Sequence, residues 1–307
     1  MSFLYFLEDL RNPVLDAFFS LITLLGEETL FMAVGMIVFW CVDKHKGYYL
    51  LFVGFVGTVL NQFLKILCRV PRPWVRDPNF TILEAAREGA GGYSFPSGHS
   101  QSSVGTFGSI AYTAEKKWVR WLCIAVAVLV PFSRMYIGVH TPADVIVGSA
   151  ISLALIFALH PLVFREDGGG MKWLIAGMLV LSLAYLVYVE CWPFPADIDA
   201  HNLASGHKNA YTLFGCTLGV AIVYPADRKW VNFSTEAVWW AQILKVVLGL
   251  IVVLAVKEGM KVPLELMFSP LTARAVRYFL VVLTAGILWP LTFRWFSRLG
   301  SKKEVSA

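Results

Sequence analysis

The sequence contains few charged residues for its length. Asp, Glu, Lys and Arg make up 15% of its 307 residues, whereas apolar residues make up 57%. A soluble domain usually carries about 25% charged residues, so this composition excludes an ordinary soluble protein and indicates a membrane protein. The net charge of +5 does not indicate a nucleic-acid partner, because the basic residues lie at the ends of apolar runs, where membrane topology accounts for them.

The sequence also lacks a cysteine pattern and a cleavable signal peptide. Its five cysteines are scattered and mostly lie in apolar runs, which excludes a disulfide framework or zinc site and favours small packing residues. Acidic and basic residues alternate with apolar residues over residues 1–26. This segment is therefore predicted to be amphipathic and to lie on the membrane surface.

Long apolar runs are what the sequence does contain. A spanning helix needs roughly 20 mostly apolar residues. Nine runs approach this length, at residues 27–42, 48–68, 97–114, 117–137, 142–163, 172–191, 209–224, 237–256 and 276–297. The sequence thus predicts an all-α, polytopic membrane helix bundle with about nine transmembrane helices and an N-terminal amphipathic helix.

A glycine cluster at residues 168–170 separates the runs into two groups. Residues 27–167 contain almost all of the unexpected polar residues, whereas residues 168–307 contain transmembrane runs without an assigned role. We expect the two groups to form one integrated domain.

The distribution of Lys and Arg predicts an orientation. The bias is best satisfied when the loop at residues 43–47 is cytoplasmic, which directs the loop at residues 69–96 outward. Tryptophans near the predicted helix ends suit an aromatic belt. We therefore expect a multi-pass protein of the cell membrane, either inner or plasma, with residues 69–96 on the extracytoplasmic side.

Three polar segments interrupt the apolar runs, at residues 65–73, 95–99 and 133–144. Alternation of the spans places all three at the same face of the membrane. Ionisable side chains inside a membrane are costly, so their convergence predicts a functional site.

The residue types in these segments suit phosphoryl transfer. Lys65, Arg72 and Arg134 supply cations for phosphate oxygens. Backbone N–H groups at a helix start near Ser97 can bind an anion, and Gly98 permits its close approach. Together they predict a positively charged cage around a phosphoryl group.

Two histidines, His99 and His140, allow one to attack phosphorus and the other to protonate the leaving alcohol. Asp144 follows His140 by four residues. If the turn is helical, its carboxylate can hold His140 Nδ1–H and leave Nε2 free to attack. The residues alone leave open which histidine is the nucleophile, although Asp144 favours His140.

The motifs Lys-x6-Arg-Pro, Pro-Ser-Gly-His and Ser-Arg-x5-His-x3-Asp, in this order, resemble the type 2 phosphatidic acid phosphatase (PAP2) superfamily, in its integral-membrane lipid phosphatase branch. The resemblance covers about residues 48–163 and makes residues 27–167 the expected catalytic helical core. It implies His140 as nucleophile, oriented by Asp144, with His99 as acid and base. The phosphate-binding residues that it implies are Lys65, Arg72, Ser97, Gly98 and Arg134.

We therefore expect a phosphohydrolase with a phosphohistidine intermediate at the outer membrane face, inhibited by vanadate and requiring no metal or cofactor. Undecaprenyl (polyprenyl) diphosphate is the first candidate substrate, on family grounds. Phosphatidate, phosphatidylglycerophosphate and sphingoid phosphates also fit, and a lipid phosphotransferase could use the same site. The expected partners are a lipid phosphate and membrane lipids, without nucleic acid, and a homodimer is left open.

Overall fold

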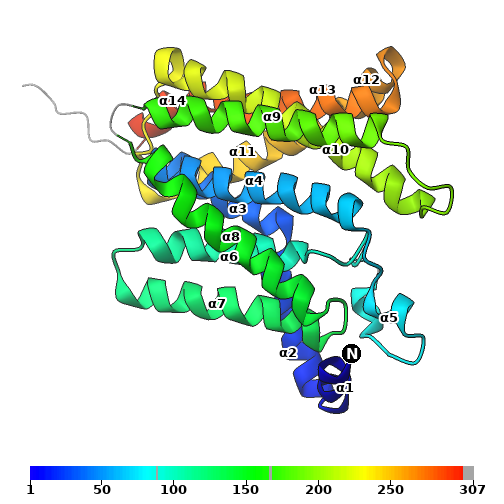
Figure 1. The fold of residues 1–307 in the computed structure, drawn as a ribbon. Coiled ribbons are helices and arrows are strands. Elements are labelled where there is room, and N and C mark those ends of the chain that lie inside the picture. Colours follow the sequence, from blue (N-terminus) through cyan, green and yellow to red (C-terminus); the bar gives the residue numbers. More distant parts are fainter. Residues whose placement is uncertain (88, 166–167, 300–307) are drawn as a thin grey trace, which may run out of the picture.

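The computed structural model describes residues 1–87, 89–165 and 168–299, and within these ranges every regular element is a helix. The long helices lie roughly side by side, so their ends gather at two opposite faces of the bundle (Figure 1). The expectation of an all-α membrane bundle is confirmed.

The helices alternate with short turns. The first half contains α1 (Ser2–Asp9), α2 (Pro13–Thr23), α3 (Glu28–Ile37), α4 (Lys44–Cys68), α5 (Pro73–Arg76), α6 (Gly98–Thr113), α7 (Lys117–Tyr136) and α8 (Pro142–Val163). The second half contains α9 (Gly169–Cys191), α10 (Ala200–Ala226), α11 (Trp239–Gly259), α12 (Lys261–Met267), α13 (Pro270–Leu283) and α14 (Phe293–Arg298). Short 3₁₀ or π-helical turns are η1 (Leu24–Gly26), η2 (Val38–Val42), η3 (Glu84–Ala86), η4 (Asp227–Val231), η5 (Thr284–Leu288) and η6 (Pro290–Thr292).

The expected number of nine crossings is not confirmed. Within the described ranges, six stretches are long and apolar enough to cross a membrane: Lys44–Arg76, Lys117–Tyr136, Pro142–Val163, Gly169–Cys191, Trp239–Met267 and Pro270–Arg298. A seventh arises if Pro13–Gly26 and Glu28–Val42, which meet at a bend of 53°, form one span.

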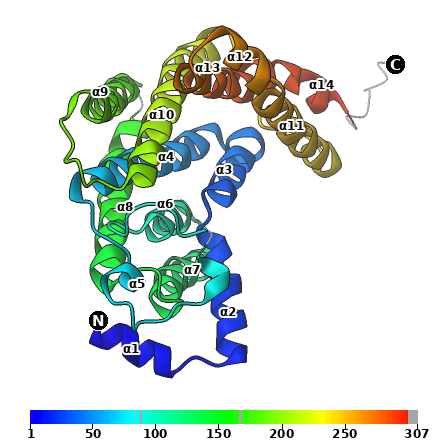
Figure 2. The same ribbon diagram turned by 90° about the vertical axis from the view of Figure 1, so that its right-hand side faces the viewer.

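Two of the predicted runs, residues 97–114 and 209–224, form α6 and α10. These helices are too polar or too short to count as spans by length and apolar composition. Helix α6 has 16 residues and buries many hydroxyl groups. It packs against α3, α4, α7 and α8, so its polar side chains face other helices (Figure 2). Helix α10 is long, but its first turns carry polar residues. Apolarity therefore identifies helices that face lipid better than helices inside the bundle.

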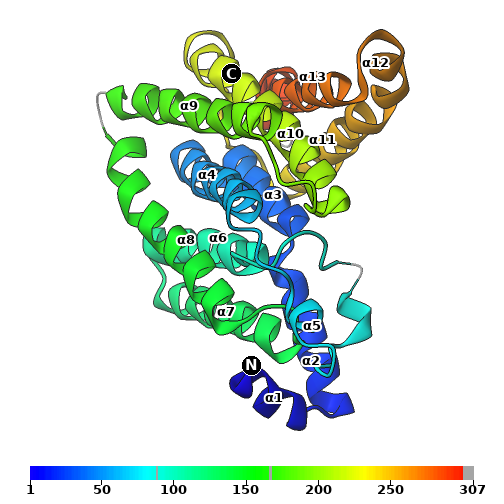
Figure 3. The same cartoon turned by 45° about the vertical axis from the view of Figure 1, so that its right-hand side comes forward.

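The helices form stacked layers. Helices α7 and α8 lie at one side, α4 is central, and α9, α10 and α13 lie at the other side (Figure 3). Helix α4 contacts α6 and α8 as well as α9 and α10. One hydrophobic core contains residues from both halves, including Tyr49, Ile156, Met171 and Phe293. The two halves thus pack through α4.

The N-terminal segment folds as two helices rather than one. In α1, Leu4 and Leu7 are buried against the protein, whereas Phe3 and Phe6 are exposed. Helix α2 leads through η1 into the bend that precedes α3. Surface attachment of residues 1–26 stays a prediction.

Candidate active site

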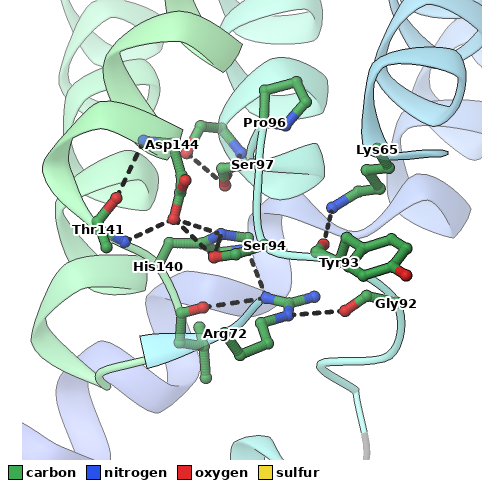
Figure 4. A network of polar contacts seen from close by, with 12 residues as sticks. Lys65, Arg72, Gly92, Tyr93, Ser94, Pro96, Ser97, His140, Thr141 and Asp144 are labelled. Carbon is green, nitrogen blue, oxygen red and sulfur yellow. Dashed lines mark hydrogen bonds and ion pairs between the residues drawn. The ribbon is translucent and has the colours of Figure 1, made fainter. Parts of the chain in front are cut away.

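Three segments meet at one end of the bundle: the end of α4 with the loop that follows it, the start of α6, and the turn between α7 and α8 (Figure 4). These are the segments that carry the three motifs. Their polar groups form one connected set of hydrogen bonds, which can be followed from one segment to the next.

The turn between α7 and α8 brings His140 back towards Arg134. Gly138 has a φ of 87°, in the left-handed region that glycine adopts without strain. The N–H groups of Val139 and His140 donate to the carbonyl oxygen of Arg134 at 3.2 and 3.3 Å. The five residues between Arg134 and His140 are therefore the end of one helix and a tight reversal.

Helix α8 begins with a capping box. Thr141 is the N-cap, and its hydroxyl accepts a hydrogen bond from the N–H of Asp144 at 3.3 Å. The Asp144 carboxylate in turn accepts from the N–H of Thr141 at 2.7 Å. This reciprocal arrangement fixes the carboxylate beside the N-cap, which directly follows His140.

Ser94 links Asp144 to His140. The direct distance from His140 Nδ1 to Asp144 Oδ2 is 3.6 Å, which is longer than a hydrogen bond. Ser94 Oγ donates to Asp144 Oδ2 at 2.6 Å and lies 3.4 Å from His140 Nδ1. His140 lies before the N-cap, outside α8, so the helical i, i+4 geometry expected from the spacing does not apply.

Arg72 holds the opposite side of the His140 ring. Its Nη1 lies 2.9 Å from His140 Nε2 and donates to the carbonyl of Val139 at 3.0 Å. Its Nε donates to the carbonyl of Gly92 at 3.1 Å, and Nη2 donates to that of Gly91 at 2.7 Å. The guanidinium is therefore held in place at the nitrogen that could act as a nucleophile (Figure 4).

The contacts of His140 assign its tautomer. A guanidinium can only donate, so Nε2 must accept from Arg72 and carries the lone pair. The proton then lies on Nδ1, directed at Ser94 Oγ and Asp144. Burial lowers the pKa of His140, and the positive charge of Arg72 lowers it further. A neutral imidazole with a free Nε2 lone pair is the form that can attack phosphorus.

Three buried cations surround this position. Lys65, Arg72 and Arg134 are only 8%, 6% and 3% exposed. Lys65 Nζ donates to the carbonyl of Tyr93 at 2.6 Å, and Arg134 Nη1 donates to Thr23 Oγ1 at 2.7 Å.

In the described part of the chain these three cations form no ion pair with a carboxylate. The Nε of Arg134 is buried without a hydrogen-bond partner among the same residues. Buried charges are normally paired. An excess of buried positive charge therefore favours an anionic ligand.

The start of α6 completes the cage. Ser97 is the N-cap, and its Oγ accepts from the N–H of Ser100 at 3.3 Å. A Cβ added at Gly98 would meet nothing closer than Asn61 Oδ1 at 3.6 Å, so the protein leaves its backbone open to approach. A Cβ at Gly148 of α8 would lie 2.5 Å from the Ser97 carbonyl. That glycine lets α8 pack directly against the start of α6.

His99 lies outside this set of hydrogen bonds. Its Nε2 lies 3.4 Å from Glu27 Oε1, at the bend between η1 and α3. Hydrogen bonds thus join Arg72 to His140 and Ser94 to Asp144, and the N–H of Ser97 donates to the carbonyl of Asp144 at 2.9 Å. Lys65 lies beside them through its bond to the carbonyl of Tyr93, whereas His99 and Arg134 have partners from the N-terminal segment.

The sequence has matches among known families and curated proteins. Residues 46–167 match the profile of the PAP2 superfamily, and residues 211–303 match that of the PAP2 superfamily phosphatase transmembrane extension. Phosphatidylglycerophosphatase B of Bacillus subtilis (strain 168) is 30% identical over 161 residues, which are 48% of this chain and 75% of that protein. The chain belongs to the PAP2 superfamily.

Two other relatives match a larger and a smaller part of this PAP2 protein. Sphingosine-1-phosphate phosphatase 1 of Mus musculus is 26% identical over 288 residues, which are 87% of the chain and 65% of that relative. The chain thus spans less than two thirds of that relative. Undecaprenyl-diphosphatase BcrC of Bacillus subtilis (strain 168) is 28% identical over 104 residues, 34% of the chain and 51% of that protein. No solved structure matches the chain.

The site of this PAP2 protein contains residues that the motifs do not predict. Only Phe95 separates Ser94 from the Pro-Ser-Gly-His motif, so its closeness to the motif was an available signal. Thr23 and Glu27 lie before residue 46, where the PAP2 match begins. An acidic residue between two apolar segments is the signal that could have identified Glu27.

The described residues contain no group of three or more His, Cys, Asp or Glu side chains that could hold a metal ion. The charged groups near His140 include instead the Arg72 guanidinium and the Lys65 ammonium, which only donate hydrogen bonds. Such a set suits an oxyanion rather than a cation.

Proposed function

We propose that this PAP2 protein is a membrane lipid phosphatase whose nucleophile is His140 Nε2. The hydrogen bond between Arg72 Nη1 and His140 Nε2, at 2.9 Å, is the observation that carries the proposal. It joins an anion-binding group and a nucleophilic lone pair at one buried point. A phosphoryl group bound by Arg72 therefore lies next to the atom that attacks it.

In the first step, a phosphoryl oxygen replaces His140 as a partner of the Arg72 guanidinium. Nε2 then forms a bond to phosphorus while the bond from phosphorus to the lipid oxygen breaks. Lys65, Arg72 and Arg134 stabilise the negative charge on the phosphoryl oxygens. The Asp144 carboxylate, which faces the Nδ1–H group through Ser94, stabilises the positive charge that develops on the ring.

His99 handles the protons in this proposal. It gives a proton to the departing lipid oxygen, which leaves as an alcohol or, from a diphosphate, as a lipid monophosphate. It then takes a proton from water as the water oxygen attacks phosphorus. The bond from phosphorus to His140 Nε2 breaks, and inorganic phosphate is released.

A long-chain lipid phosphate monoester is the substrate class that we propose first. The mouse sphingosine-1-phosphate phosphatase matches 87% of the chain, including much of the second half, whereas BcrC matches only 34%. Phosphatidylglycerophosphatase B, whose name also indicates a lipid monoester, supports the same class. A polyprenyl diphosphate, expected first from the sequence, is the second candidate because of BcrC.

We propose that the site faces the extracytoplasmic side. The opposite end of the bundle carries Lys44, Lys46, Lys116, Lys117 and Arg120, as the positive-inside rule requires of a cytoplasmic face. Exposed tryptophans at that end, including Trp118, Trp121, Trp173 and Trp230, suit a membrane interface. In this arrangement α6, α10 and the run at residues 27–42 also cross, which with the six apolar spans gives the nine crossings expected from the sequence.

The decisive experiment measures phosphate release from a panel of lipids by the purified protein. The panel contains a sphingoid phosphate, phosphatidate, phosphatidylglycerophosphate and a polyprenyl diphosphate, each with and without a chelator. We expect metal-independent release from a monoester, and a loss of about 10⁴-fold or more in His140→Ala because the nucleophile is removed.

Three results would contradict parts of this proposal. Full activity of His140→Ala would exclude His140 as nucleophile. Loss of activity on chelation would exclude metal-independent hydrolysis. Transfer of phosphate to a second alcohol, without release of inorganic phosphate, would identify a phosphotransferase instead.

A further inference from the structure

The bend between α2 and α3 lies directly against the start of α6. A Cβ added at Gly26 would lie 2.7 Å from Val130 Cγ1 and 3.1 Å from both His99 Cβ and the His99 carbonyl oxygen. A larger residue at this position would require Val130 or His99 to shift. The bend is thus packed onto the backbone of His99.

Two side chains from this bend contact residues of the site. Thr23 Oγ1 accepts a hydrogen bond from Arg134 Nη1 at 2.7 Å, and Glu27 Oε1 lies 3.4 Å from His99 Nε2. Both residues precede the PAP2 match, which begins at residue 46. The N-terminal segment therefore contacts two residues of the proposed site, and the side chains that make these contacts lie outside the three motifs.

The charges that face His99 make the Glu27 contact important. Arg134 from α7, Arg72 from the loop before α5 and the His140 ring all lie near enough to interact with His99. The two arginines oppose a positive charge on its ring, whereas the Glu27 carboxylate favours one. Among the described residues that face His99, Glu27 is the carboxylate that offsets this repulsion.

We propose that Glu27 is a positioning residue for proton transfer by His99. Its carboxylate holds Nε2–H, which leaves Nδ1 to exchange the proton with the leaving lipid oxygen and then with water. It also stabilises the protonated ring that exists between these two steps. This inference rests on the proposed phosphatase function and adds a residue to it.

The test compares two substrates that differ in their leaving group. An alkyl phosphate, such as a sphingoid phosphate, needs a proton on its departing oxygen, whereas p-nitrophenyl phosphate has a good leaving group and needs little help. Glu27→Gln should lower kcat/KM for the alkyl phosphate, which reports the steps up to departure of the leaving group, by about tenfold, a part of the 10²–10⁴-fold that a general acid contributes. The value of kcat/KM for p-nitrophenyl phosphate should change by less than about twofold, because the proton donation that Glu27 supports contributes little to the departure of nitrophenolate.

Two variants serve as controls. Glu190→Gln removes a carboxylate from a similar pair in the second half, where Glu190 Oε1 lies 2.9 Å from His207 Nδ1, and should leave both rates unchanged. Glu27→Asp keeps the charge and should recover part of the alkyl phosphate rate. Thermal unfolding of each variant in detergent separates misfolding from a loss of proton transfer.

The outcomes separate this inference from the proposed function. Wild-type protein that releases no phosphate from any substrate would overturn the function itself. Active wild-type protein with Glu27→Gln rates equal to wild type, or lowered equally for both substrates, would overturn the role of Glu27 alone.

Discussion

Each half of the molecule buries a lysine, and the two lysines differ in what surrounds them. Lys65 donates to the carbonyl of Tyr93 at 2.6 Å and lies among two further buried cations. Lys245 of α11 is fully buried, donates to the carbonyl of Thr235 at 3.2 Å, and lies 4.6 Å from the ring centre of Phe293. A carbonyl and an aromatic face can satisfy a single ammonium. Burial of a charge therefore does not identify a site, whereas a cluster of like charges does.

The two halves are nevertheless connected at the site. Tyr93, whose carbonyl binds Lys65, packs in one hydrophobic cluster with Tyr185 and Val189 of α9 and with Ala210 of α10. Gly206 of α10 lies close to Ile66, next to Lys65, since a Cβ there would meet Ile66 at 2.8 Å. Helices of the second half thus pack against the loop that carries Tyr93 and thereby against the residue that binds Lys65.

The largest effect expected within this comparison tests the lysine pair directly. Lys65→Met should lower kcat/KM for the lipid phosphate by about 10²–10³-fold, as loss of one oxyanion-stabilising donor does. Lys245→Met should leave kcat/KM within about twofold, because an apolar side chain of similar volume replaces a charge with no anionic ligand. Steady-state kinetics of the two purified variants would contradict the comparison if both lost activity equally.

A smaller effect is expected from a matched pair of buried serines. Ser94→Ala removes the link between Asp144 and His140 and should lower kcat by about tenfold, less than the 10²-fold that a misplacement of 1 Å can cost. Ser182→Ala on α9 removes a hydroxyl that donates only to the carbonyl of Leu179 and should leave kcat unchanged. Equal rates in both variants would show that Asp144 orients His140 without Ser94.

The smallest effect concerns protonation rather than rate. Because burial and Arg72 lower the pKa of His140, its ring should stay neutral as the pH falls through 6.5, the ordinary value for histidine. Nitrogen NMR of labelled protein, with the signal assigned by its loss in His140→Ala, should show the Nδ1–H tautomer there. An imidazolium at or above pH 6.5 would contradict the assigned geometry.

Much of the site can be predicted from the sequence, because the motif residues lie at helix ends and alternation of the helices brings those ends together. The spacing from His140 to Asp144 predicted their proximity but not the 3.6 Å gap that Ser94 bridges. That gap depends on where α8 begins, and Thr141 as N-cap places His140 outside the helix.

The contacts of Glu27 and Thr23 could not be predicted from spacing. Glu27 lies 72 residues from His99, and Thr23 lies 111 residues from Arg134. Such contacts depend on how the bend before α3 packs against α6 and α7, for which the sequence contains no local pattern. The number of crossings stays a prediction for a related reason, since α6 is surrounded by protein and need not be apolar to lie within the membrane.

One oxygen of the Asp144 carboxylate accepts hydrogen bonds from both Thr141 and Ser94. The same oxygen that caps the first turn of α8 also holds the group that orients His140. Fraying of that turn, a local opening that requires less free energy than global unfolding, would release the proposed nucleophile while nearly all of the bundle stays folded. Under the proposed mechanism, heat should therefore inactivate the protein before it unfolds.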